Sequence, residues 1–104
     1  MSIYGRWKAA TIAASGSKSS IVDLTRSYDR LTLEIPLMGE CKLSLEVSED
    51  LDGPYYELGK DTTTDLETFN RADVWQLGGW RYIKVVSSAQ QSAERLIRVR
   101  GMAY

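Results

Sequence analysis

The feature of this sequence that most constrains its fold is a strict alternation of apolar and polar side chains. Residues 31–37 place Leu or Ile at every second position, and residues 43–47 repeat the pattern with Leu, Leu and Val. Successive side chains of a β-strand point to opposite faces of a sheet, so this period predicts two half-buried strands that share one core. The short connection at residues 38–41 favours a hairpin between them. Pro36 has no N–H to donate, which predicts that the first strand ends there or lies at an edge.

Strand signals also occur elsewhere in the chain. The remaining expected strands are residues 9–14, 21–24, 55–58, 80–87 and 95–100. The segment 80–87 is the strongest of them, because it is rich in aromatic and β-branched side chains. A turn is expected at residues 49–54, where Asp, Gly and Pro gather. One helical turn is expected at residues 70–77, because Asn70 can cap its start and Gly78 can end it.

These short strands define the expected fold class. About seven or eight of them, with at most one short helical turn, predict an all-β protein built as an antiparallel, jelly-roll-like β-sandwich. The 104 residues suffice for one hydrophobic core. We expect an N-terminal arm at residues 1–8, a single sandwich domain at residues 9–101 and a C-terminal tail at residues 102–104.

Composition excludes several kinds of catalysis. The chain has no histidine and one cysteine, Cys41, so Ser-His-Asp and Cys-His mechanisms and an intramolecular disulfide are impossible within it. Cys41 follows a predicted strand and is expected to be a small buried apolar residue. The acidic turn at residues 49–52 does not have the spacing of an EF-hand loop. We therefore expect no metal, no cofactor and no enzymatic activity.

Membranes and nucleic acids are not expected partners. No apolar run approaches the roughly 18 residues of a membrane span, and residues 1–8 lack the apolar region of a signal peptide. The isoelectric point of about 5.4 argues against binding to nucleic acid.

Charge is divided unevenly along the chain. Residues 46–67 contain eight acidic residues and one basic residue, a net charge of −7, whereas residues 81–104 carry a net charge of +4. Such a division can orient a partner by charge complementarity, although solvated strand faces and loops would also explain it.

The two ends of the chain carry large side chains that are costly to leave in water. Either they fold back onto the sandwich or they anchor to a neighbouring protein, and the sequence leaves both possibilities open. The candidate partner-binding residues are Tyr4 and Trp7 in the arm, Arg95, Arg98 and Arg100 in the last strand, and Met102 and Tyr104 in the tail.

Aromatic residues in the centre of the chain allow a second kind of binding. They are Tyr55, Tyr56, Trp75, Trp80 and Tyr82. Exposed rings could form a platform on which sugars stack, and a carbohydrate-binding β-sandwich module is therefore an alternative function. Packing of at least one of Trp80 and Tyr82 in the core is the simpler explanation.

The order of motifs resembles that of small all-β virion proteins of tailed bacteriophages. The resemblance rests on an Ala/Thr-rich strand at residues 9–16, a Val-Asp-Leu strand at residues 22–24 and a strand ending in Pro36. It continues with Leu-x-Leu-x-Val-Ser-x-Asp-x-x-Gly-x-Tyr-Tyr-x-Leu at residues 43–58, and with Arg-Tyr-Ile-Lys-Val followed by a loop with Gln and Ala at residues 81–95. It covers about nine tenths of the chain. The basic last strand and the aromatic arm depart from the pattern, which leaves the position in the virion open.

This resemblance implies a structural role rather than catalysis. It implies a capsid decoration or cement protein that binds the major capsid protein, as a dimer or trimer on the capsid surface, after synthesis in the host cytoplasm. A tail or fibre component is the alternative within the same class.

Overall fold

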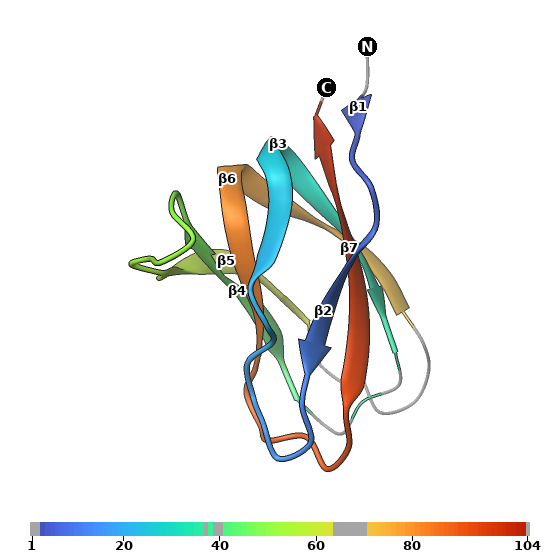
Figure 1. Cartoon of the computed structure of the whole chain (residues 1–104). Helices are drawn as coiled ribbons and strands as arrows, with labels where there is room; N and C mark the ends of the chain where they lie inside the picture. The colour runs from blue at the N-terminus through green and yellow to red at the C-terminus, as the bar shows by residue number, and fades with distance from the viewer. Residues whose placement is uncertain (1–2, 37, 39–40, 64–70, 104) are drawn as a thin grey trace.

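The computed structural model describes residues 3–36, 38, 41–63 and 71–103, and in this part of the chain every regular element is a β-strand. The strands are β1 (Ile3–Tyr4), β2 (Lys8–Ile12), β3 (Val22–Ile35), β4 (Leu43–Ser48), β5 (Tyr56–Thr63), β6 (Arg71–Ser87) and β7 (Arg95–Ala103) (Figure 1). All of their pairings are antiparallel. The prediction of an all-β, sandwich-like antiparallel fold is confirmed.

Hydrogen bonds join the strands into one continuous path that folds over on itself. The order is β1-β7-β3-β6-β4-β5, with β2 also beside β7. The second half of β3 lies between β7 and the first half of β6, whereas the second half of β6 lies between β4 and the first half of β3. Two long strands therefore run through both layers of the sandwich, as strands do where they switch sheets at a bend.

Local backbone features produce these bends. In β3 the register with β6 shifts between Asp23 and Tyr28 and again before Arg30, and Thr25 has a φ of 72°. In β6 Gly78 and Gly79 have φ values of 77° and 89°. Glycine adopts positive φ without steric cost, and such bulges re-aim a strand.

The core lies between the two layers. Its largest fully buried side chains come from β2, β3, β4, β6 and β7: Ile12, Leu31, Leu33, Ile35, Leu43, Leu45, Val47, Leu77, Ile83, Val85 and Ile97. The described apolar positions of the two alternating segments thus point inward as predicted, and Leu37 lies outside the described residues. Cys41 is buried beside them as a free thiol, which confirms its expected role.

Two sequence predictions are wrong. The expected hairpin between residues 31–37 and 43–47 does not form, because β3 pairs with β6 and β7 while β4 pairs with β5 and β6. The expected helical turn is also absent from the described part of residues 70–77. Residues 71–77 belong to β6, where Trp75 and Leu77 point inward at a spacing of two. Gly78 bends that strand instead of ending a helix, and Asn70 lies outside the described residues.

Several strands extend beyond the predicted segments. The segments 21–24 and 31–37 are parts of the single strand β3, which ends at Ile35, before Pro36, as expected. β7 continues past the expected end of the domain to Ala103, so Met102 is a strand residue and not part of a free tail. In the arm, Ile3 and Tyr4 form β1 and pair with Ala103 and Met102. The described residues contain no helix long and apolar enough to cross a membrane.

Candidate functional site

The outer face of β7 carries the basic residues predicted to bind a partner. Ile97 and Val99 point into the core and are completely buried. The alternation of the strand therefore directs Arg98 and Arg100 to the opposite, outer face. The buried residues of this strand thus determine the direction in which its arginines point.

The N-terminal arm brings two aromatic rings to the same face. β1 pairs with the end of β7, and β2 pairs with residues 95–99 of the same strand. Between them, the Gly5 N–H donates a 2.8 Å hydrogen bond to the Gly101 carbonyl. Both halves of the arm are thus fixed along β7, and Tyr4 and Trp7 lie over the two arginines.

Arginines and aromatic rings alternate in stacked contacts. The Arg100 guanidinium carbon lies 5.0 Å from the ring centre of Tyr4 and 4.6 Å from that of Trp7. The Arg98 guanidinium carbon lies 4.9 Å from the ring centre of Trp7. Cation–π contacts of this kind contribute about 0.5–1 kcal/mol each at exposed sites. We name these four residues, Tyr4, Trp7, Arg98 and Arg100, the Arg–aromatic ladder.

Charged and polar neighbours complete the ladder. The Arg98 Nη1 donates to the Glu34 carboxylate at 2.9 Å, but both side chains are about half exposed, so this ion pair is weak. The Arg100 Nε is buried and has no hydrogen-bond partner among the described residues, an uncommon condition for a buried donor. Stacking against two rings holds Arg100 in that position, and its guanidinium is thereby fixed before any partner binds.

The other predicted site residues lie apart from the ladder. Arg95 has the same parity as Ile97 and Val99, is partly buried, and its Nε donates to the Gln91 side chain at 3.1 Å. Met102 is 8% exposed, and its sulfur accepts a hydrogen bond from the Thr32 hydroxyl. Tyr104 lies outside the described residues.

The sequence analysis did not identify three further residues of this face. Thr32 pairs with both Arg100 and Val74, which places the three in one row across β7, β3 and β6. Val74 and Leu96 are each 53% exposed, although they are apolar. The alternation in residues 31–37 could have identified Thr32, but Val74 was hidden by the prediction of a helical turn.

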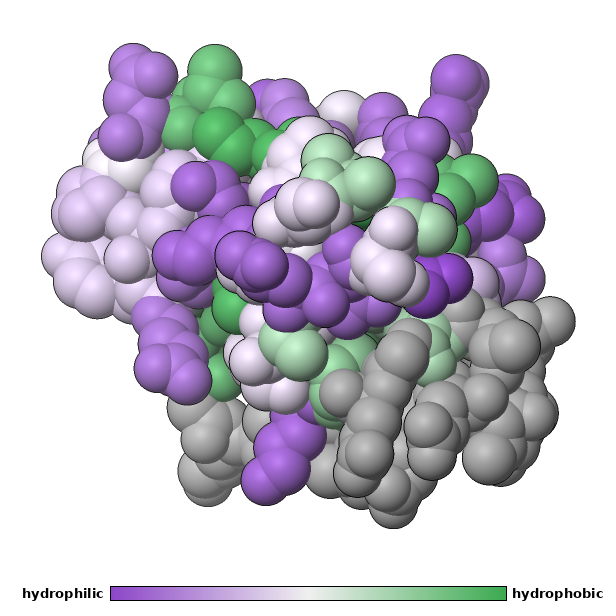
Figure 2. Space-filling model, turned by 90° about the horizontal axis from the view of Figure 1, so that it is seen from below, coloured by the Kyte–Doolittle hydropathy of each residue, from purple (hydrophilic) through white to green (hydrophobic). Residues whose placement is uncertain are grey.

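The end of the molecule at the β2–β3 and β6–β7 connections differs in character from the face that carries the ladder. Figure 2 views the end below the strands as they stand in Figure 1, where the β2–β3 and β6–β7 connections lie. The described residues there are mostly hydrophilic, with apolar residues in separate small spots. This end therefore shows no broad apolar area among its described residues that would indicate a binding surface. The ladder, on the outer face of β7, remains the candidate site. No group of three or more potential metal ligands occurs within the described ranges.

Comparison with known proteins identifies the fold but no family. No family model matches this chain, and no curated protein sequence is significantly similar to it. Among solved structures, the SPBc2 prophage-derived protein YomS matches with a TM-score of 0.60 and 11% identity, over 97% of this chain and 96% of that one. The family 29 carbohydrate-binding module CBM29-2, studied as its D114A mutant, matches with a TM-score of 0.55 and 9% identity, over 93% and 92%.

A third similar structure is a much larger enzyme. A family 89 glycoside hydrolase from Clostridium perfringens, in complex with GlcNAc-alpha-1,4-galactose, matches with a TM-score of 0.56 and 15% identity. The match covers 92% of this chain but only 14% of the enzyme. At such identities the likeness establishes a shared β-sandwich fold and no function, because one fold serves many unrelated functions.

Proposed function

We propose that this chain is a structural protein of a bacteriophage particle, and specifically a capsid decoration or cement protein that binds the major capsid protein. The observation that carries the proposal is the Arg–aromatic ladder, a preformed group of exposed and partly buried side chains stacked on one sheet face. In this proposal the chain acts by binding and has no enzymatic activity.

The ladder has the composition of an energetic centre in a protein–protein interface. Trp, Tyr and Arg are the residues that most often dominate binding energy when they are desolvated. Tyr4 is 55% exposed, so a partner can still cover much of its ring. Because Arg98 and Arg100 are already held by stacking, binding would cost less side-chain entropy than it would for mobile arginines.

Charge indicates what kind of surface the ladder fits. Its two arginines lie next to an arm that also contains Arg6 and Lys8, while Glu34 is the acidic side chain paired with Arg98. An acidic patch on the capsid protein would complement this arrangement. Many copies held on one shell can make individually modest contacts effective.

The fold comparison supports this class of function. The prophage-derived protein YomS shares the fold over nearly the whole length of both chains, so the same architecture forms an entire prophage-encoded protein. The resemblance of the sequence motifs to small all-β virion proteins points in the same direction.

A co-sedimentation experiment tests the proposal. The purified chain is mixed with empty capsids of the phage that encodes it, and the pelleted fraction is measured for Trp7→Ala, Arg100→Ala and the control Leu51→Ala. Leu51 is an exposed apolar residue away from the ladder. Each ladder variant should weaken binding by about 30-fold, corresponding to roughly 2 kcal/mol, while the control binds like the parent chain.

Circular dichroism of each variant verifies that the fold is retained. Capsid binding that both ladder variants leave unchanged would show that another face makes the contact. Binding to purified tails but not to empty capsids would instead assign the chain to the tail or fibre.

A further inference from the structure

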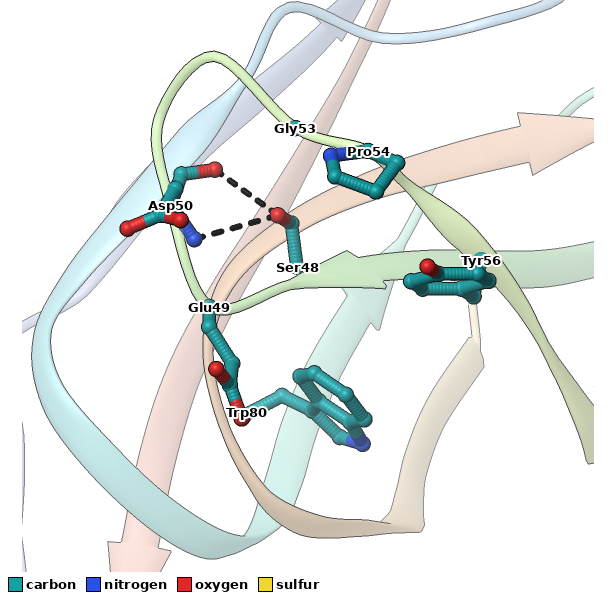
Figure 3. Close-up of a pocket in the computed structure, with 7 residues that line it drawn as sticks. All are labelled: Ser48, Glu49, Asp50, Gly53, Pro54, Tyr56 and Trp80. Atoms are coloured by element: carbon teal, nitrogen blue, oxygen red, sulfur yellow. Dashed lines mark hydrogen bonds between the residues drawn. The ribbon is translucent and has the colours of Figure 1, made fainter.

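A small hollow lies on a different part of the molecule from the ladder. It has a volume of about 270 Å³ and is formed by the β4–β5 turn, Tyr56 of β5 and Trp80 of β6 (Figure 3). The end of β4 contributes Ser48, and the turn contributes residues 49–50 and 53–54. Drug-sized ligands occupy cavities of roughly 300–1,000 Å³, so this volume suits a single small ring.

Two aromatic rings line the hollow and are available to a ligand. Tyr56 is 58% exposed, and its hydroxyl has no hydrogen-bond partner among the described residues. Trp80 packs against the core and also contributes to the wall of the hollow. The other central aromatic residues are engaged elsewhere. Trp75 is 3% exposed, the ring of Tyr55 is covered by the Lys84 ammonium at 4.4 Å, and the Arg81 guanidinium carbon lies 5.0 Å from the ring centre of Tyr82.

The turn beside these rings carries two carboxylates. Glu49 and Asp50 are exposed, and in the described part of the chain their carboxylates make no hydrogen bond or ion pair. Figure 3 shows the Glu49 side chain extending from the turn toward Trp80, whereas the Asp50 carboxylate points to the outer side of the turn. An ionised carboxylate only accepts hydrogen bonds, so Glu49 suits a ligand that presents hydroxyl or ammonium donors.

The turn that carries the carboxylates is fixed by its own hydrogen bonds. The Ser48 hydroxyl donates to the Asp50 carbonyl at 2.8 Å and accepts from the Asp50 N–H at 3.1 Å. The Gly53 N–H donates to the same carbonyl at 3.0 Å, and the Tyr55 hydroxyl donates to the Leu51 carbonyl at 2.8 Å. The hollow is thus largely formed before a ligand arrives, which lowers the entropic cost of binding.

We infer that this hollow binds one ring of an uncharged or amine-bearing saccharide, with the sugar face stacked on Tyr56 and Trp80 and its hydroxyls donating to Glu49. A sugar ring has both an apolar C–H face and a rim of hydroxyl donors. The hollow presents aromatic rings to the first and a carboxylate acceptor to the second. The two carboxylates, with Asp52 in the same turn, repel anionic sugars. This site goes beyond the proposed capsid contact and uses different strands, so either function can fail without the other.

An NMR titration tests this inference. Amide shifts of the ¹⁵N-labelled chain are followed during addition of galactose, N-acetylglucosamine, glucosamine and, as the anionic comparison, N-acetylneuraminic acid, each to about 50 mM, because a single ring in an open hollow binds weakly. We expect saturable shifts in residues 48–56 and at Trp80 with at least one of the first three sugars. The anionic sugar should bind at least tenfold more weakly.

Three variants locate the ligand. Tyr56→Ala and Glu49→Gln should each weaken binding at least tenfold, and both change exposed side chains, so the fold should persist. Tyr4→Ala, which removes an equally exposed ring from the ladder, should leave sugar affinity unchanged. No saturable shift with any of the three sugars would overturn the inference, as would binding that Tyr56→Ala does not alter or that favours the anionic sugar.

Discussion

At the scale of single residues, Gly101 determines how the end of β7 meets the core. A Cβ at this position would lie 2.1 Å from the Tyr28 ring, and one at Gly5 would lie 2.7 Å from the Tyr28 hydroxyl. The buried ring thus fills a slot that only two glycines leave open. Because Gly5 and Gly101 are also joined by a backbone hydrogen bond, this slot fixes the arm that carries Tyr4 and Trp7.

Gly101→Ala should therefore destabilise the protein. The added methyl group forces the Tyr28 ring out of its slot, and overpacking of this kind costs about 1–3 kcal/mol in the free energy of unfolding. Urea denaturation followed by fluorescence measures the change. Tyr28→Ala in the same chain should remove much of the additional cost, since the two residues are in direct contact. A loss below about 0.5 kcal/mol would mean that the ring moves aside freely.

At the scale of strands, the sequence revealed which side chains face inward but not which strands are neighbours. Alternation fixed the inward residues of β4 and of the second half of β3, because burial acts on each side chain individually. It did not reveal that residues 22–35 form one strand, since the polar residues 25–27 interrupt the pattern at the bend. Pairing of β3 with β6 joins residues about 40 to 60 positions apart, and no local signal specifies such a contact.

Asp23 secures the bend of β3 and gives it a dependence on pH. Its carboxylate accepts hydrogen bonds from Arg81 of β6 at 2.8 and 3.1 Å and from the Thr25 N–H at 2.8 Å. The Arg81 contact, and then the Thr25 contact, lower the pKa of Asp23 below its usual value. The stabilisation is therefore fully present above the unfolded-state pKa of about 3.9, and it is lost as the pH falls through the lower pKa of the folded state.

Asp23→Asn should consequently lower the melting temperature at neutral pH and have a much smaller effect in strong acid, where the native carboxyl is also uncharged. Thermal unfolding at both pH values, monitored by circular dichroism, measures this difference. Asp29→Asn, an exposed change in the same strand, is the control and should have little effect at either pH. An equal loss at both pH values would show that the carboxylate charge does not contribute.

At the scale of the whole molecule, the arm and the last strand meet because both ends of the chain lie on one edge of the sandwich (Figure 1). The sequence identified Tyr4, Trp7, Arg98 and Arg100 as separate candidates from residue type and position. Their stacking depends on the register of β1 and β2 against β7, which side-chain pattern alone does not specify. The hollow at Tyr56 and Trp80 was less predictable, because it requires the bend of β6 at Gly78 and Gly79 to meet the β4–β5 turn.

The uneven charge of the molecule leads to a final prediction about association with the capsid. Arg98→Glu replaces a positive charge beside Glu34 and Trp7 with a negative one, and should slow association with an acidic partner surface. The effect should be large at an ionic strength of about 0.02 M and small at about 0.5 M, since the screening length falls below 5 Å at high salt. Biolayer interferometry on immobilised capsids measures both rate constants across this range.

Arg26→Glu, an equal charge change at an exposed position outside the ladder, should slow association much less. If both variants behave alike, net charge alone governs the encounter. If Arg98→Glu instead accelerates dissociation at every salt concentration, Arg98 lies within the desolvated contact and does not merely guide the approach.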